Sequence, residues 1–146
     1  RPSEFRTTTD DHQLTAQNVH YVGITVPDLD DTVDFFVEAV GCDELYPKGP
    51  FGDSEGQTME RRLDVHPDAT ASLAMLRCGP TMNLELFEWD AADQDETPPN
   101  NSDVGATHLA LQVDDIDTAM DRLASRDDVT VLDEPQTNDD GRRQRA

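Results

Sequence analysis

Cysteine is scarce in this chain of 146 residues, which contains only Cys42 and Cys78. Neither a CxxC motif nor a Cys/His spacing typical of zinc sites is present. We therefore expect no disulfide framework.

Positive charge is also scarce. The chain has 11 Lys and Arg residues against 32 Asp and Glu, so its formal net charge is −21. Such a charge disfavours nucleic acid and anionic lipid as partners. The acidic blocks are short and lie between regular apolar segments, which indicates a folded domain with a hydrated acidic surface, as in halophilic proteins, rather than disorder. We expect low salt to destabilise the folded domain, because the repulsion among its acidic side chains is then unscreened.

Long apolar runs are missing, as are several catalytic motifs. No run approaches the roughly 20 residues that span a bilayer, and no secretory signal is visible. A glycine-rich phosphate loop and a hydrolase nucleophile elbow are also absent. We therefore expect one cytoplasmic domain of ordinary size without a membrane partner.

What the sequence does contain is a repeat. HYVGITVPDLD at residues 20–30 is similar to THLALQVDDID at residues 107–117. Each copy predicts a strand, a turn rich in aspartate and a helix, so the fold is expected to have two similar halves. The alignment that pairs Val26 with Val113 also pairs Asp28 with Asp115 and Asp30 with Asp117.

Periodicity predicts the elements of each half. Asp30 or Asp31 is expected to cap the first helix, whose apolar face is Val33, Phe36, Val37 and Val40, and Gly41 to end it. A loop is predicted at 47–56, a turn at 78–80, and a solvated His66 in a loop. Strands are predicted at 19–26, 42–46, 58–65, 72–77 and 82–89 in the first half; the second half has strands at 106–113 and 129–132 and a helix at 116–125.

These elements predict four parts of the chain. Residues 1–18 form a polar arm, residues 19–90 a first βαβββ module, residues 91–104 an acidic linker, and residues 105–146 a truncated second module. A module that stops after one helix and two strands leaves its sheet edge open. We expect the natural chain to continue or a partner to complete the sheet.

Three segments together resemble the vicinal oxygen chelate superfamily, the group of glyoxalases, bleomycin-resistance proteins and extradiol dioxygenases. They are HYVGITVPDLDDTVDFF, NLELFEW and THLALQVDDID, and the resemblance covers about residues 19–133. It implies an α+β fold in which paired βαβββ modules form a curved mixed sheet around a central cup, here with the second module incomplete. It also implies that the cup commonly holds a divalent metal ion and that a homodimer is expected.

Strand alternation selects candidate side chains for this cup. In the segment 106–113, His108 and Gln112 share a face, and the resemblance implies that His108 is a metal ligand. The alternative is a histidine satisfied by hydrogen bonds at a strand start. In the segment 82–89, Asn83, Glu85, Phe87 and Trp89 point away from Leu84 and Leu86.

Glu85 is a second candidate, in the middle of its predicted strand. A buried carboxylate is costly unless it is paired, protonated or bound to metal. The resemblance makes Glu85 a metal ligand or a catalytic base, and the alternative is an ion pair with Arg77. Glu88 is predicted to lie on the opposite face.

The first strand departs from the family pattern. The repeat places Tyr21, not His20, opposite His108, with Tyr21 and Thr25 on the cup face and His20 on the helix side. A neutral phenol with a pKa of about 10 is a poor ligand for most divalent ions. His20 becomes a metal ligand only through a bulge or a register slip. No counterpart of the family's fourth ligand, a glutamate in the last strand, occurs before Ala146.

Two functions fit these residues. The first is a glyoxalase-like metal-dependent isomerase, epimerase or lyase on a small oxygenated substrate, with Zn, Ni, Mn or Fe bound. Its base would be Glu85 or a carboxylate in the missing last segment. Dioxygenase chemistry is less favoured, because it needs two histidines and a carboxylate on iron. The second is a metal-free protein of bleomycin-resistance type that binds a small molecule. The candidate ligand-binding residues are Tyr21, Thr25, Arg77, Phe87, Trp89 and Gln112.

Overall fold

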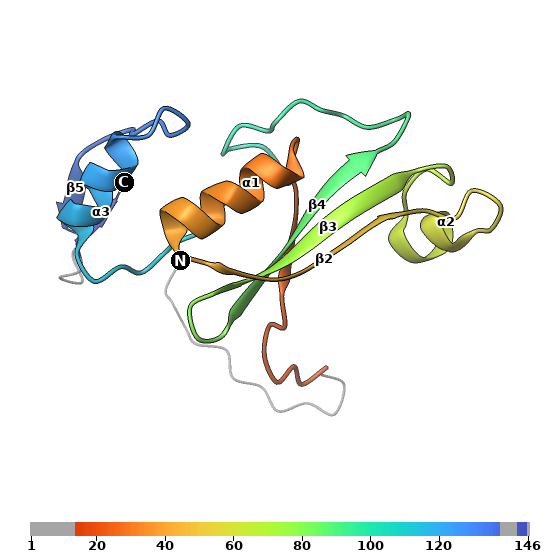
Figure 1. Ribbon diagram of the computed structural model, residues 1–146, viewed down its shortest axis with the longest axis horizontal. Coiled ribbons are helices and arrows are strands. Elements are labelled where there is room, and N and C mark those ends of the chain that lie inside the picture. The colour runs from red at the N-terminus through yellow and green to blue at the C-terminus, as the bar shows by residue number, and fades with distance from the viewer. Residues whose placement is uncertain (1–13, 138–142, 146) are drawn as a thin grey trace, which may run out of the picture.

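The computed structural model describes residues 14–137 and 143–145, so most of the predicted arm lies outside it. Figure 1 shows the first half as a sheet with helices, and the second half to one side of it. The elements are β1 (Val22–Thr25), α1 (Leu29–Phe35), the π-helix η1 (Phe36–Val40), β2 (Asp43–Phe51), α2 (Thr58–Leu63), β3 (Thr70–Cys78), β4 (Met82–Asp90), α3 (Ile116–Ala124), β5 (Pro135–Thr137) and β6 (Arg143–Arg145).

The first half is one curved, open, mixed sheet. Its strand order is β1-β4-β3-β2, with β1 parallel to β4 and the other neighbours antiparallel. The predicted turn between β3 and β4 is confirmed, and Gly79 within it has a φ of 73°, a conformation that glycine adopts without strain. The α+β fold class predicted from the sequence is confirmed.

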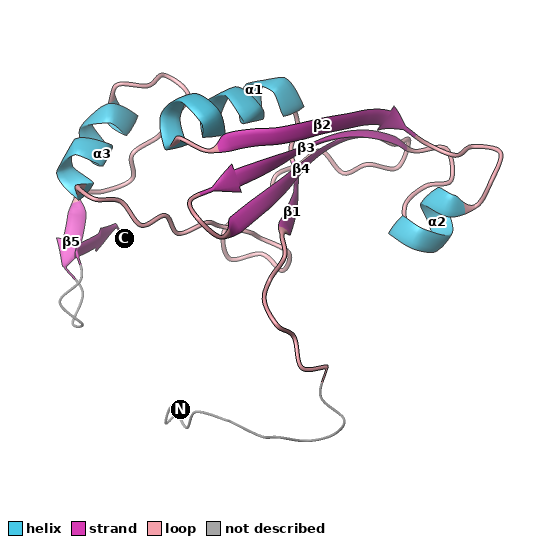
Figure 2. Ribbon diagram, turned by 60° about the horizontal axis from the view of Figure 1, so that its bottom comes forward, coloured by secondary structure: helices cyan, strands magenta, loops and turns pink. Residues whose placement is uncertain are grey.

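The core lies between one face of this sheet and α1 with η1 (Figure 2). Leu76, Leu84 and Leu86 are at most 1% exposed. Val33, Phe36 and Val40 pack against this cluster as predicted, whereas Val37 is 38% exposed. The change to a π-helix at Phe36 widens the turn, which rotates Val37 out of the apolar stripe.

The repeat is visible in the helix caps. The Asp28 carboxylate accepts the backbone N–H of Asp31 at 3.0 Å, and the Asp115 carboxylate accepts that of Thr118 at 2.9 Å. These caps occupy aligned positions of the two copies. The prediction of Asp30 or Asp31 as the cap is wrong by two or three residues; both lie in the first turn, where negative charge favours the helix dipole. Gly41 ends the helix at a φ of 87°, as predicted.

The second half is less regular than predicted. The helix is confirmed as α3, but residues 106–113 and 129–132 form no strand. The strand prediction is wrong there because a strand needs a partner: β1 pairs only with β4, the last strand of its module, and the described residues after 105 provide no equivalent of β4. The helices within residues 14–137 are too short or too polar to extend across a bilayer.

Two local predictions in the first half are also wrong. Residues 58–65 contain helix α2 rather than a strand, because Met59 is buried and the Asp53 side chain accepts the N–H groups of Gly56 and Thr58 at the helix entry. The predicted loop at 47–56 is partly strand, since β2 continues to Phe51. As an edge strand, β2 tolerates its prolines.

The two cysteines form one disulfide, which the expectation of no disulfide framework did not anticipate. Asp43 pairs with Arg77 in the β2–β3 ladder, so Cys42 and Cys78 lie opposite each other and form a disulfide. The two residues are separated by 36 positions in the sequence. Cysteine counting fails here because only the strand register brings the two sulfurs together.

Candidate functional site

The candidate site lies on the face of the sheet turned away from α1, which we call the concave face. The ladder pairs Glu85 of β4 with Gly23 of β1 and Met75 of β3, and Met75 with Tyr46 of β2. The predicted alternation of β4 is confirmed, because Leu84 and Leu86 lie in the core on the other side. The concave face therefore carries Thr25, Tyr46, Lys48, Leu73, Met75, Arg77, Asn83, Glu85, Phe87 and Trp89.

Glu85 is the buried acid of this face, with 9% of its surface exposed. Burial raises the pKa of its carboxyl above the ordinary value, and the positive charge of Lys48 partly offsets this. The carboxylate makes no hydrogen bond or ion pair with any residue that the structure describes. A carboxyl group whose pKa is raised by burial is a candidate general acid or base.

Arg77 does not pair with Glu85. Its Nε donates to the Oδ1 of Asn83, and its Nη1 donates to the carbonyl of Pro80 at 3.4 Å. These bonds hold the guanidinium at the turn between β3 and β4. The ion pair between Glu85 and Arg77, which was the alternative interpretation of Glu85, is therefore not formed.

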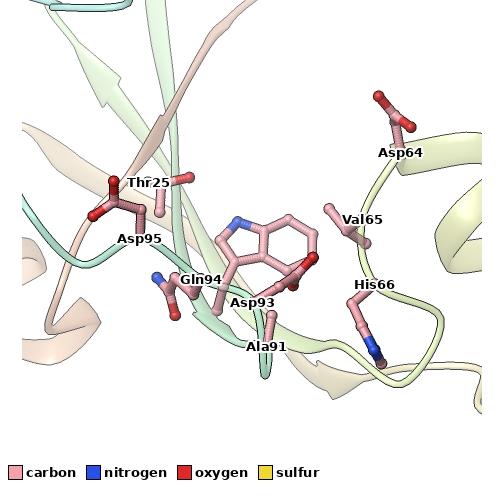
Figure 3. Close-up of a pocket in the computed structure, with 9 residues that line it drawn as sticks. Thr25, Asp64, Val65, His66, Ala91, Asp93, Gln94 and Asp95 are labelled. Atoms are coloured by element: carbon pink, nitrogen blue, oxygen red, sulfur yellow. The ribbon is translucent and has the colours of Figure 1, made fainter.

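Phe87 and Trp89 form an aromatic pair further along β4. Their ring centroids are 5.4 Å apart, and the rings are tilted by only 14°. Trp89 borders a pocket of about 310 Å³, shown in Figure 3. Its lining residues are Thr25, Asp64, Val65, His66, Trp89, Ala91, Asp93, Gln94 and Asp95; we call this the Trp89 pocket.

Sequence reasoning missed two parts of this region. Lys48 joins the concave face only through the β2–β3 register, although as the single lysine of the chain it was conspicuous. His66, expected in solvent, is half-buried in the pocket lining. No sequence signal near His66 indicated that its loop would fold back against Trp89.

The sequence profile of the glyoxalase/bleomycin resistance protein/dioxygenase superfamily matches residues 20–144. The chain belongs to this superfamily. It is 49% identical over 123 residues to a 2-epi-5-epi-valiolone epimerase of Actinomyces sp. That match covers 84% of this chain but only 66% of the epimerase, so the chain spans just under two thirds of its relative.

A solved structure supports the fold of the superfamily. The crystal structure of a glyoxalase family protein from Bacillus cereus matches with a TM-score of 0.61 and 20% identity. The match covers 87% of this chain and 84% of that one. At this identity the likeness concerns the arrangement of strands and helices.

The superfamily commonly uses a divalent metal, which needs several ligand side chains gathered in one place. No group of three or more His, Cys, Asp or Glu side chains among them is placed to hold an ion. His108 and Gln112 are exposed in the segment without a strand, and His20 and Tyr21 are exposed before β1. The described residues therefore do not assemble a metal site around Glu85.

Proposed function

We propose that this chain is part of an epimerase that inverts a carbon next to the carbonyl of a small oxygenated substrate, with Glu85 as its proton-transferring group. The observation that carries the proposal is the buried, unpaired carboxyl of Glu85 in the middle of the concave face. The epimerase relative supports the reaction class, and the ending of its substrate's name denotes a ketone.

The chemistry follows from this environment. The Glu85 carboxylate removes the proton from the carbon beside the carbonyl, and the electron pair of the C–H bond moves to the carbonyl oxygen as an enolate. A water molecule protonates the opposite face of that carbon, which gives the epimer, and the proton held by Glu85 neutralises the hydroxide left behind. A raised pKa makes the carboxylate a stronger base, and Met75 and Phe87 flank it with apolar side chains.

We propose that Lys48 stabilises the negative charge that develops on the enolate oxygen. It lies on the same face, two strands from Glu85, and its charge acts on the Glu85 carboxyl. An ammonium group near the enolate oxygen stabilises the charge that develops in the transition state. Gly23 adds no side chain beside Glu85, and the ring of Phe87 borders the space that one would occupy.

The direct test is hydrogen exchange by the full-length protein, incubated with 2-epi-5-epi-valiolone in D₂O. We expect NMR to show a second epimer and deuterium at the carbon next to the carbonyl. Exchange requires that the C–H bond be broken, whichever product accumulates. Neither epimer nor deuterium after prolonged incubation would contradict the proposal.

A second candidate function is binding without chemistry, as in the bleomycin-resistance members. The stacked Phe87 and Trp89 favour it, because aromatic faces bind ligand rings. Saturable binding of the ketone without any exchange would favour this function over the epimerase.

We also propose a homodimer, and a divalent metal for the alternative in which Glu85 is a ligand rather than the free base. The ligands are then Glu85 and His108, with His20 as a weaker third. Because these residues are not gathered in the described chain, metal binding requires that residues 106–113 pair with another strand. We expect elemental analysis of the full-length dimer to find Zn, Ni, Mn or Fe that is lost in His108→Ala. No metal after reconstitution, or metal unaffected by His108→Ala, would contradict this ligand set.

A further inference from the structure

We propose that the Trp89 pocket binds the hydroxyl-bearing side of a polyhydroxylated ring. The inference rests on the proposed function, because it names the substrate class that the same concave face would take. Most of the residues that it adds lie outside the strands, in the loop after α2 and in the segment after β4.

The pocket has the size and floor for such a ligand. Its volume of about 310 Å³ is at the small end of ligand sites. Figure 3 shows Thr25 on one side of the pocket and Val65 and His66 on the other, and the indole of Trp89 belongs to its lining. Stacking on Phe87 fixes the indole, so an apolar ring face is presented at little entropic cost.

The polar groups around this floor include both donors and acceptors. His66 Nδ1 accepts the backbone N–H of Asp68 at 3.1 Å, so the proton of the neutral ring lies on Nε2, which donates. The Asp93 carboxylate makes no bond with a residue in the described ranges and is an acceptor. Gln94 and Thr25 supply groups of both kinds.

This mixture distinguishes a polyol from an organic cation. Each hydroxyl group both donates and accepts, so a ring of hydroxyls can satisfy a histidine N–H, an amide and a carboxylate together. An ammonium ion only donates, and the N–H groups of His66 and Gln94 would oppose it. The donor and acceptor pattern therefore favours the uncharged polyol, although the three aspartates alone would also attract a cation.

The pocket is within reach of Glu85. Four residues separate Glu85 from Trp89, which corresponds to about 13 Å along β4 at roughly 3.3 Å per residue. Phe87 lies midway on the same face. A ring above Phe87 therefore lies between the two, with one edge toward Glu85 and the opposite, hydroxyl-bearing edge toward the pocket.

Trp89 is the single tryptophan of the chain and reports on the pocket by its fluorescence. We expect myo-inositol, an uncharged polyol without a ketone, to change the fluorescence of the 146-residue chain saturably. We expect Asp93→Asn to weaken this binding about tenfold, since a hydrogen bond to a charged group is lost. The exposed Asp127→Asn, which removes the same charge elsewhere, should bind as the wild type does, and Trp89→Phe serves as the blank.

The opposite results would overturn the assignment. They are saturation by choline but not by myo-inositol, no saturation by the polyol, or equal weakening by Asp93→Asn and Asp127→Asn. The proposed reaction is judged separately, by deuterium exchange. Polyol binding without exchange would leave the pocket assignment standing and reject the epimerase.

Discussion

Glu85→Gln is expected to slow deuterium exchange and epimerisation by about 10²- to 10⁴-fold, the usual contribution of a positioned general base. Glutamine keeps the shape of the side chain but cannot accept a proton at working pH. Substrate binding should change little, because the concave face keeps its other side chains. The measurement is kcat for exchange in D₂O, followed by NMR.

Glu88→Gln is the matched control for this variant. Glu88 lies on the same strand but on the opposite face, where its carboxylate accepts the backbone N–H of Leu29 at 3.0 Å. Removing its charge weakens the start of α1 without touching the concave face, so exchange should stay close to the wild-type rate. Equal loss in both variants would indicate a structural effect and remove Glu85 from the mechanism.

The same Glu85→Gln change is expected to stabilise the fold at neutral pH. The pKa of Glu85 is raised by burial, so the folded state binds a proton more tightly than the unfolded state does. Wild-type stability therefore falls relative to the variant as pH rises from the ordinary glutamate pKa through the raised one. Urea unfolding across this window tests the sign, and a wild type that gains relative stability with pH would indicate a paired carboxylate.

Much of the fold could be predicted from the sequence, because its signals are local. Alternation along β4 places Glu85 on the opposite face from Leu84 and Leu86. An offset of 87 residues between the two copies of the repeat aligns the capping aspartates Asp28 and Asp115. Side-chain period and capping depend on near neighbours in the chain, so one sequence is enough to read them.

What could not be predicted depends on pairing between distant segments. The β2–β3 register alone joins Cys42 to Cys78 and brings Lys48 to the concave face. The strand predicted around His108 is not formed, because it has no partner among the described residues, so the site role of His108 stays a prediction. Loops such as the one at His66 are placed by tertiary contacts, which leave no periodic trace.

Leu86→Ala is expected to cost about 2–5 kcal/mol of unfolding free energy, the usual range for a large-to-small change in a core. Leu86 is 0% exposed on β4, the strand between β1 and β3. Its ladder neighbours are Ile24 and Ala74. Ala74 is too small to fill the space left behind, so the loss should be near the upper part of that range.

The control is Leu45→Ala, the same change on the edge strand β2, where the side chain is 46% exposed. Its cost should stay below about 1 kcal/mol, as for surface substitutions in general. Both free energies are measured by urea unfolding in high salt, which screens the repulsion among acidic residues. Equal costs would mean that α1 and η1 do not cover Leu86. The assignment of the concave face as the exposed side of the sheet would then be wrong.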